Sequence, residues 1–168
     1  MTVHLRELKI KDAPLMLEWM KDPLVSRFFR FDFSSMTVDD CIRFIESAED
    51  DPKTKHFAIV NEDDEYLGTI SLKNITDKDA EYAISTRRAV HGTGVALEAT
   101  RQILSYAFDD LGLERVYLNV LVDNQRANAF YRKAGFVFQY LEKNAVVING
   151  IARDLNWYYT DNIKKVTS

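Results

Sequence analysis

The stretch AVHGTGVALEAT, residues 89–100, decides the fold of this 168-residue chain. Gly92 and Gly94 stand where a strand-like segment ends and a helical segment begins. Such a junction directs several backbone N–H groups, and the positive end of the helix dipole, at one point. The stretch therefore predicts a cradle for an anion, and the usual anion is a phosphate or a pyrophosphate.

Two other phosphate-binding motifs do not fit this stretch. A dinucleotide-binding fold carries Gly-x-Gly-x-x-Gly near its first strand. Here the glycines lie in the middle of the chain, and Leu97 occupies the place of the third glycine. A nucleoside-triphosphatase loop requires Gly-Lys followed by Ser or Thr, and the sequence has no such triplet.

The composition is that of an ordinary globular domain, with 46% hydrophobic and 29% charged residues. The net charge of −4 argues against nucleic acid and anionic membranes as partners. One cysteine, Cys41, and three scattered histidines form no metal-ligand spacing. The N-terminus lacks a signal-peptide core, and no apolar run reaches membrane-spanning length. We therefore expect one cytoplasmic domain over residues 1–168, without a metal.

Hydrophobic periodicity divides the chain into short strands and helices. Thr37 and Asn124 are the expected N-caps, and Gly112 and Gly135 are the expected helix stops. The order predicts an α/β fold with a mixed, mostly antiparallel sheet and helices on both faces. The expected strands are residues 3–10, 56–60, 66–72, 81–85, 115–122, 136–141 and 149–159, and the expected helices are residues 11–20, 37–48, 94–111 and 124–134.

Two segments together resemble the signatures of the GCN5-related N-acetyltransferase (GNAT) superfamily. Residues 91–96 are similar to Gln/Arg-x-x-Gly-x-Gly/Ala, except that His91 replaces the usual Gln or Arg. Residues 124–136, NQRANAFYRKAGF, are similar to Asn-x-x-Ala-x-x-x-Tyr-x-x-x-Gly-Phe, at the family's spacing from the first segment. The resemblance covers nearly the whole chain in element order. Residues 19–23 and the aromatic stretch after them look most like the branch that acetylates ribosomal-protein N-termini (RimJ/RimL-like).

The resemblance implies that acetyl-coenzyme A is the cosubstrate and that its pyrophosphate binds in the cradle. It also implies a splay between the two middle strands. Unpaired backbone amides at Ile84, Ser85 and Thr86 would bind the pantetheine carbonyls and the thioester oxygen there. The cradle residues expected to contact the cofactor are His91, Gly92, Thr93, Gly94, Val95 and Ala96, and Asn124, Asn128 and Tyr131 are expected to contact it from the second segment.

The resemblance assigns Tyr131 as the general acid and Glu81 as the general base, either directly or through water. A phenol with a pKa near 10 is protonated at neutral pH and can protonate the departing thiolate. An amine acceptor is mostly ammonium at pH 7, so it must lose a proton before it attacks. Each residue also has an ordinary reading: Tyr131 as a core aromatic, and Glu81 as a carboxylate facing solvent.

The acceptor is expected to be a primary amine: a protein N-terminus, a polyamine, an amino sugar or a small amine. Residues 28–33 carry four phenylalanines and predict either a substrate pocket or a buried loop. Arg27 and Arg30 suit an acidic or phosphate-bearing acceptor, such as a nucleotide sugar, and Arg87 and Arg88 suit cofactor phosphates. A non-catalytic acyl-coenzyme A sensor is the alternative to an enzyme, and the family also makes a homodimer an expectation.

Overall fold

The computed structural model describes residues 2–166, which form a seven-stranded sheet in the order β1-β2-β3-β4-β5-β7-β6. All neighbouring strands are antiparallel except β4 and β5, which are parallel. This is the mixed, mostly antiparallel sheet that the sequence predicts. The strands are β1 (His4–Arg6), β2 (Lys55–Val60), β3 (Tyr66–Lys73), β4 (Asp79–Thr86), β5 (Arg115–Leu121), β6 (Val137–Ile148) and β7 (Ile151–Asp161).

The helices begin and end where the capping residues direct. Thr37 and Asp40 form a reciprocal capping box at the start of α3, and Asn124 accepts a hydrogen bond from the N–H of Ala127 at the start of α5. A π-helical turn, Tyr106–Asp110, extends α4 toward Gly112. The helices are α1 (Ala13–Lys21), α2 (Pro23–Ser26), α3 (Val38–Ser47), α4 (Val95–Ser105), α5 (Gln125–Lys133) and α6 (Ile163–Val166).

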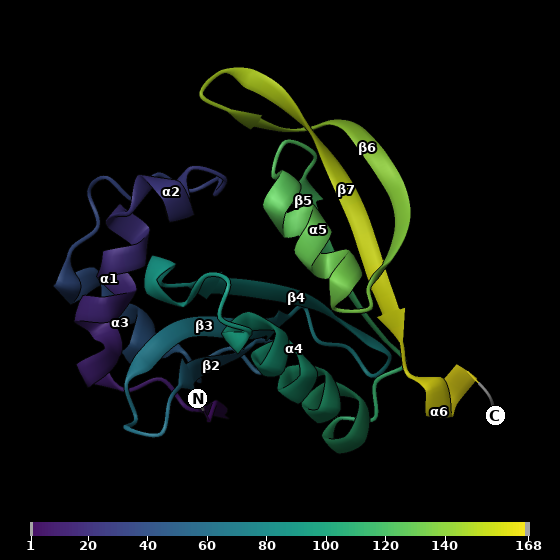
Figure 1. Cartoon of the computed structure of the whole chain (residues 1–168), viewed down its shortest axis with the longest axis horizontal. Helices are drawn as coiled ribbons and strands as arrows, with labels where there is room; N and C mark the ends of the chain where they lie inside the picture. Colours follow the sequence, from purple (N-terminus) through teal and green to yellow (C-terminus); the bar gives the residue numbers. More distant parts are fainter. Residues whose placement is uncertain (1, 167–168) are drawn as a thin grey trace.

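Helices cover both faces of the sheet, as predicted. On one face, Met16 and Trp19 of α1 pack with Ala58 of β2 in one apolar cluster, to which α3 also contributes. On the other face, Ile103 of α4 packs with Ile70 of β3 in a second cluster, to which α5 contributes. Figure 1 shows α4 and α5 in front of the sheet and α1 and α3 at its side. None of the helices within residues 2–166 has the length and apolar character that crossing a membrane requires.

Two predicted strands have the wrong end, and one short helix was not predicted. The first strand ends at Arg6, and Ile10, its expected last residue, instead begins a 3₁₀ turn (Ile10–Asp12). The four-residue α2, capped by Asp22, is too short for periodicity to reveal. Strand β6 does not stop at residue 141 but continues through an irregularity around Asn144 to a two-residue turn. In that turn Asn149 and Gly150 both have positive φ (51° and 76°), which matches the twist of the long hairpin.

Candidate active site

The parallel ladder between β4 and β5 is short and opens into a splay. It pairs three residues of each strand and ends at Glu81 and Tyr117, although β4 continues to Thr86 and β5 to Leu121. Beyond this pair the strands diverge, and Figure 1 shows β5, β7 and β6 rising away from β4 and β3. The predicted splay is therefore confirmed, and Glu81 and Tyr117 mark its vertex.

The hydrogen bonds at the ends of β4 show which of its backbone groups face the splay. The carbonyl of Lys78 accepts a bond from the N–H of Arg115, on the β5 side (3.2 Å). The N–H of Arg87 donates to the carbonyl of Leu67, on the β3 side (2.9 Å). Because backbone groups alternate between the two edges of a strand, the even-numbered residues of β4 face β5.

Ile84 and Thr86 therefore direct their backbone N–H and C=O groups into the splay. The backbone of Ser85 faces the opposite way, toward Thr69 of β3. Of the three residues expected to contact pantetheine, Ile84 and Thr86 therefore have their backbone groups at the opening of the splay. Ser85 has its backbone groups on the opposite edge of β4, beside β3. Gly68 allows β3 to lie close to this end of β4, because a Cβ there would stand 2.5 Å from the Ser85 carbonyl oxygen.

The cradle has the backbone geometry of an anion site. Gly92 and Gly94 have φ of 77° and 86°, a region that residues with a Cβ seldom adopt. Gly94 is the N-cap of α4, so the N–H groups of Gly94, Val95 and Ala96 precede the first α-helical hydrogen bond. Within residues 2–166, the N–H of Val95 makes one long contact, 3.4 Å to the Thr93 hydroxyl. A Cβ on either glycine would meet nothing within 4 Å, so the space in front of these groups is open.

His91 links the cradle to α5 in a way that sequence reasoning missed. Its Nδ1 lies 2.5 Å from the Arg126 guanidinium, which can only donate, so His91 accepts the bond as a neutral ring. Burial, and then the Arg126 charge, lower the pKa of His91. The only advance signal was that Arg126 lies within the second matched segment. Histidine at position 91, in place of the usual Gln or Arg, thus holds the positively charged side chain of Arg126 beside the cradle.

Tyr131 lies at the vertex of the splay, on the α4–α5 face. Its ring packs edge-on against Tyr82 of β4 (5.9 Å between ring centres) and contacts Tyr158 of β7 (6.2 Å), so it spans both diverging halves of the sheet. Burial raises its pKa to about 12. Tyr82 and Tyr158 use their hydroxyls within the protein, on Thr100 and Asn128, whereas the Tyr131 hydroxyl makes no hydrogen bond within residues 2–166. Tyr131 is thus a core aromatic whose hydroxyl is protonated and makes no hydrogen bond to the rest of residues 2–166.

The two asparagines of α5 have structural roles. Asn124 is the predicted N-cap. Asn128 is buried; its amide nitrogen donates to the carbonyls of Leu121 (3.1 Å) and Asn124 (2.7 Å). Its amide oxygen accepts from Asn156 (2.9 Å) and Tyr158 (2.8 Å). The amide of Asn128 is therefore fully used in joining α5 to the sheet, which leaves little capacity for the predicted cofactor contact.

Glu81 lies at the same vertex but on the opposite face from Tyr131, because adjacent residues of a strand point to opposite sides. It shares that face with its ladder partner Tyr117, and with Asn119 further along β5. The pKa of the Tyr117 hydroxyl is raised, mainly by burial and then by the charge of Glu81. A carboxylate and a tyrosine thus flank the vertex on the face opposite Tyr131.

The aromatic stretch divides between core and surface. Phe29 and Phe33 pack on Trp19 (5.4 and 5.6 Å between ring centres), which is the buried-loop reading. Phe31 is 60% exposed, and Phe28 lines a cavity of about 330 Å³. The cavity is lined by Arg27, Phe28, Leu121, Ile148 and Arg153.

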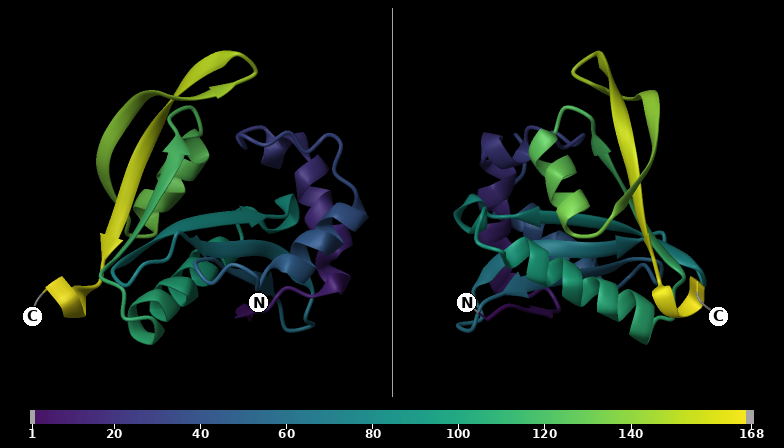
Figure 2. Two further views of the ribbon diagram at one scale, coloured as in Figure 1. Left: turned by 180° about the vertical axis from the view of Figure 1, so that it is seen from behind. Right: turned by 45° about the vertical axis from the view of Figure 1, so that its right-hand side comes forward.

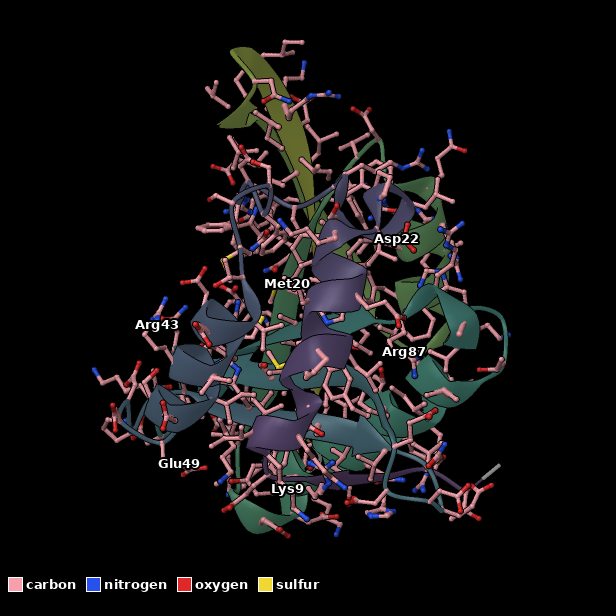
Figure 3. The ribbon with its side chains drawn as sticks, turned by 90° about the vertical axis from the view of Figure 1, so that its left-hand side faces the viewer. Lys9, Met20, Asp22, Arg43, Glu49 and Arg87 are labelled. Atoms are coloured by element: carbon pink, nitrogen blue, oxygen red, sulfur yellow. The ribbon has the colours of Figure 1, made fainter. Side chains whose placement is uncertain are left out.

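Arg87 and Arg88 are engaged elsewhere than at a phosphate. Arg87 pairs with Glu18 of α1 (2.9 Å), and Arg88 pairs with Asp22, the N-cap of α2 (2.8 Å). Figure 3 shows Arg87 and Asp22 on the same side of α1. The two ion pairs tie the loop before α4 to the first helices, so both predicted phosphate ligands have structural partners.

Comparison with known proteins agrees with this geometry. Residues 2–137 match the model of the acetyltransferase (GNAT) domain family. The acetyltransferase PseH of Campylobacter jejuni is 26% identical over 130 residues, which cover 77% of this chain and 80% of that relative. The probable N-acetyltransferase YjcK of Bacillus subtilis is 29% identical over 167 residues, covering 91% and 90%.

A crystal structure of spermidine N-acetyltransferase from Vibrio cholerae, in complex with CoA and spermine, has the same fold. The two chains superimpose with a TM-score of 0.86 over 98% of each, at 22% identity. One relative is named a putative ribosomal N-acetyltransferase and another a spermidine N(1)-acetyltransferase, so the ribosomal-protein branch stays a prediction. The family model covers most of the chain, and the relatives are named as acetyltransferases, which favours an enzyme over a sensor. The chain therefore belongs to the GNAT family, and it is an acyltransferase.

Proposed function

We propose that this protein, acting as a single domain, transfers the acetyl group of acetyl-coenzyme A directly to a primary amine within a ternary complex. The residues present fit this cosubstrate. The open amides of the Gly92–Gly94 cradle suit its pyrophosphate, and Arg126 adds a positive charge beside them. The backbone groups of Ile84 and Thr86 suit the amide-rich pantetheine arm, which would run from the cradle into the splay.

In this mechanism the acceptor approaches from the Glu81 face of the sheet. Glu81, directly or through a water molecule, takes a proton from the acceptor ammonium. The freed amine attacks the thioester carbon, and a β4 amide hydrogen-bonds to the developing oxyanion. The carbon–sulfur bond then breaks, and the Tyr131 hydroxyl gives its proton to the departing thiolate. The attacking nitrogen loses its second proton, which passes through water to restore the Tyr131 phenol, and Glu81 releases the first proton to solvent. The products are an N-acetylated amine and coenzyme A, and no acyl-enzyme is required.

The observation that carries the proposal is the Tyr131 hydroxyl. It is the uncommitted member of a group of three packed tyrosines, and it lies where the two strands separate. A pKa of about 12 keeps this hydroxyl protonated at a pH where a lysine-like acceptor amine, with a pKa near 10.4, has lost its proton. The two protonation states that the reaction needs therefore coexist.

Replacing Tyr131 with Phe tests the proposal. Because the ring and its packing are kept, Tyr131→Phe should lower kcat by about 10²- to 10⁴-fold. Titration calorimetry should show unchanged affinity for coenzyme A. Tyr106→Phe is the matched control, since Tyr106 packs on Phe57 beyond the end of α4, away from the splay. Unchanged turnover in Tyr131→Phe would remove the assignment of the acid.

We also propose that the protein forms homo-oligomers through β6. This strand is at the edge of the sheet and leaves large apolar side chains half exposed, among them Val137, Phe138 and Tyr140. One structural neighbour, spermidine N-acetyltransferase from Vibrio cholerae, has a dodecameric structure. Light scattering should give a mass that is a multiple of 19.4 kDa, and Phe138→Lys should reduce it; a monomer in the native protein would contradict this.

A further inference from the structure

The cavity beside the splay is lined mainly by positive charge and apolar surface. The Arg27 guanidinium stacks over the Phe28 ring, 4.7 Å from its centre, and it forms no ion pair within residues 2–166. Across the cavity, Arg153 pairs with Asp123 through one end of its guanidinium. Its Nε is buried without a hydrogen-bond partner among residues 2–166, and the rest of the guanidinium lines the cavity.

A third arginine stands between this cavity and the vertex. Arg30 donates to the side-chain oxygen of Asn119 (2.6 Å), a neutral partner that leaves its charge uncompensated. Within residues 2–166, Asp123 is therefore the only carboxylate that pairs with any of the three arginines. The figures agree: Figures 1 and 2 show the β6–β7 hairpin reaching over toward α2, the arrangement that brings Arg153 to Arg27.

The three arginines lie at definite distances from the reaction centre. Tyr117, Asn119 and Leu121 occupy one face of β5, in order from the vertex outward. At about 3.3 Å per residue, Asn119 lies about 7 Å and Leu121 about 13 Å from Tyr117. Glu81 supplies a negative charge at the vertex, and the arginines supply positive charge at the outer end. The acceptor face is thus electrically polarised along β5.

We propose that the acceptor is an amine that also carries a phosphate or pyrophosphate group, which Arg27, Arg30 and Arg153 bind. The ammonium of such a molecule would lie at Glu81, and its phosphate would lie about 7 to 13 Å away among guanidiniums. Arginine forks match phosphate oxygens with paired hydrogen bonds, and Phe28 offers a flat apolar surface beside them. An amino sugar linked to a nucleotide has this size and charge distribution. This inference deepens the proposed acetyl transfer and rests on it.

The same charges argue against a polyamine acceptor, although some relatives are named spermidine N-acetyltransferases. A polyamine would place its second and third ammonium groups where the arginines lie. Like charges at such separations repel in a partly desolvated site. The family resemblance leaves both polyamines and amino sugars open as acceptors. The three arginines favour an amino sugar that carries a phosphate group.

Binding measurements on the protein saturated with coenzyme A test this inference without turnover, because coenzyme A then occupies the cradle. We expect uridine diphosphate and inorganic pyrophosphate to bind this complex in calorimetry, and spermidine to give no heat. Arg27→Gln, Arg30→Gln and Arg153→Gln should each weaken uridine diphosphate binding by about 10- to 100-fold, as expected for lost charge-assisted hydrogen bonds.

Arg43→Gln is the matched control, because Arg43 is an exposed arginine of α3 that pairs with Asp40. Figure 3 shows Arg43 well away from α2. It should leave the binding of uridine diphosphate unchanged. Three results would overturn the inference. They are no binding of either phosphate probe, binding of uridine diphosphate by Arg27→Gln and Arg153→Gln as tight as by the native protein, or binding of spermidine or an acidic peptide that is tighter than that of uridine diphosphate. Failure of the acetyl-transfer proposal would be seen separately, as lost coenzyme A binding or an active Tyr131→Phe variant.

Discussion

The two halves of the candidate site are built differently. The cofactor half consists mainly of backbone: the amides before α4, the positive-φ glycines and the unpaired edge of β4. The acceptor half consists of side chains from distant segments, with Arg27 directly after α2, Glu81 in β4 and Arg153 in β7. A backbone site tolerates many sequences around a few glycines, whereas a side-chain site changes with each substitution. Such a division would let substitutions in the acceptor half change the acceptor while the cofactor half stays the same.

Glu81→Gln should have the largest effect in the acceptor half. We expect kcat/KM at pH 7 to fall by about 100-fold, and the loss to shrink toward pH 10, where the acceptor amine deprotonates in solution. The measurement is a pH profile of both proteins with one acceptor. Glu46→Gln, on the exposed side of α3, is the control. A loss that stays constant with pH would show that Glu81 acts through structure and not as a base.

Gly94→Val tests the backbone half. The left-handed φ of 86° costs a residue with a Cβ about 1–2 kcal/mol, and the new side chain would fill the open cradle. We expect coenzyme A affinity to fall by about 10- to 100-fold in calorimetry, while kcat at saturation changes little. Gly112→Val imposes similar strain (φ 67°) beyond the far end of α4. Equal losses in both variants would mean that general destabilisation, and not the cradle, is responsible.

Gly68→Ala should have a smaller effect, because Gly68 lies on β3 and contacts β4 on the edge away from the splay. Its Cβ would lie 2.5 Å from the Ser85 carbonyl oxygen and 2.9 Å from the Thr86 Cα, so the end of β4 must move. We expect unfolding free energy to fall by about 1–3 kcal/mol, by urea titration. The KM for acetyl-coenzyme A should rise several-fold. A destabilised protein with an unchanged KM would show that the positions of Ile84 and Thr86 do not govern cosubstrate binding.

The backbone half of the site was easier to predict from the sequence than the side-chain half. The cradle, the N-cap at Asn124 and the Asn149–Gly150 turn were predictable, because each depends on the local conformation of a few adjacent residues. The splay came from family resemblance alone, since no local pattern marks where a ladder ends. The alternation that sets Ser85 apart from Ile84 and Thr86 also needed the hydrogen bonds at both ends of β4.

Contacts between distant side chains were not predictable. Arg153 meets the Arg27 cavity only because β6 and β7 extend past Asn144 to a long hairpin, and a break in alternation there hid the length of β6. His91 was noticed as a departure from the family, but its partner Arg126 lies 35 residues away. Sequence reasoning singled out one member of each contact, Arg27 and His91, but not its partner. It could not pair them, because pairing depends on tertiary packing.

His91→Gln has the smallest expected effect, and it tests the one side chain on which the backbone half depends. Glutamine can accept the Arg126 bond, so coenzyme A affinity at pH 7.5 should change by no more than about threefold. The difference should lie in pH dependence. The folded-state pKa of His91 is below that of the unfolded chain, so as pH falls through 6.5 the unfolded state binds a proton first and stability declines. The loss of urea midpoint between pH 7.5 and pH 5 should therefore be smaller in His91→Gln than in the native protein. Identical losses would mean that the His91 ring is not held neutral by its place between the cradle and α5, and that Arg126 is positioned by other contacts.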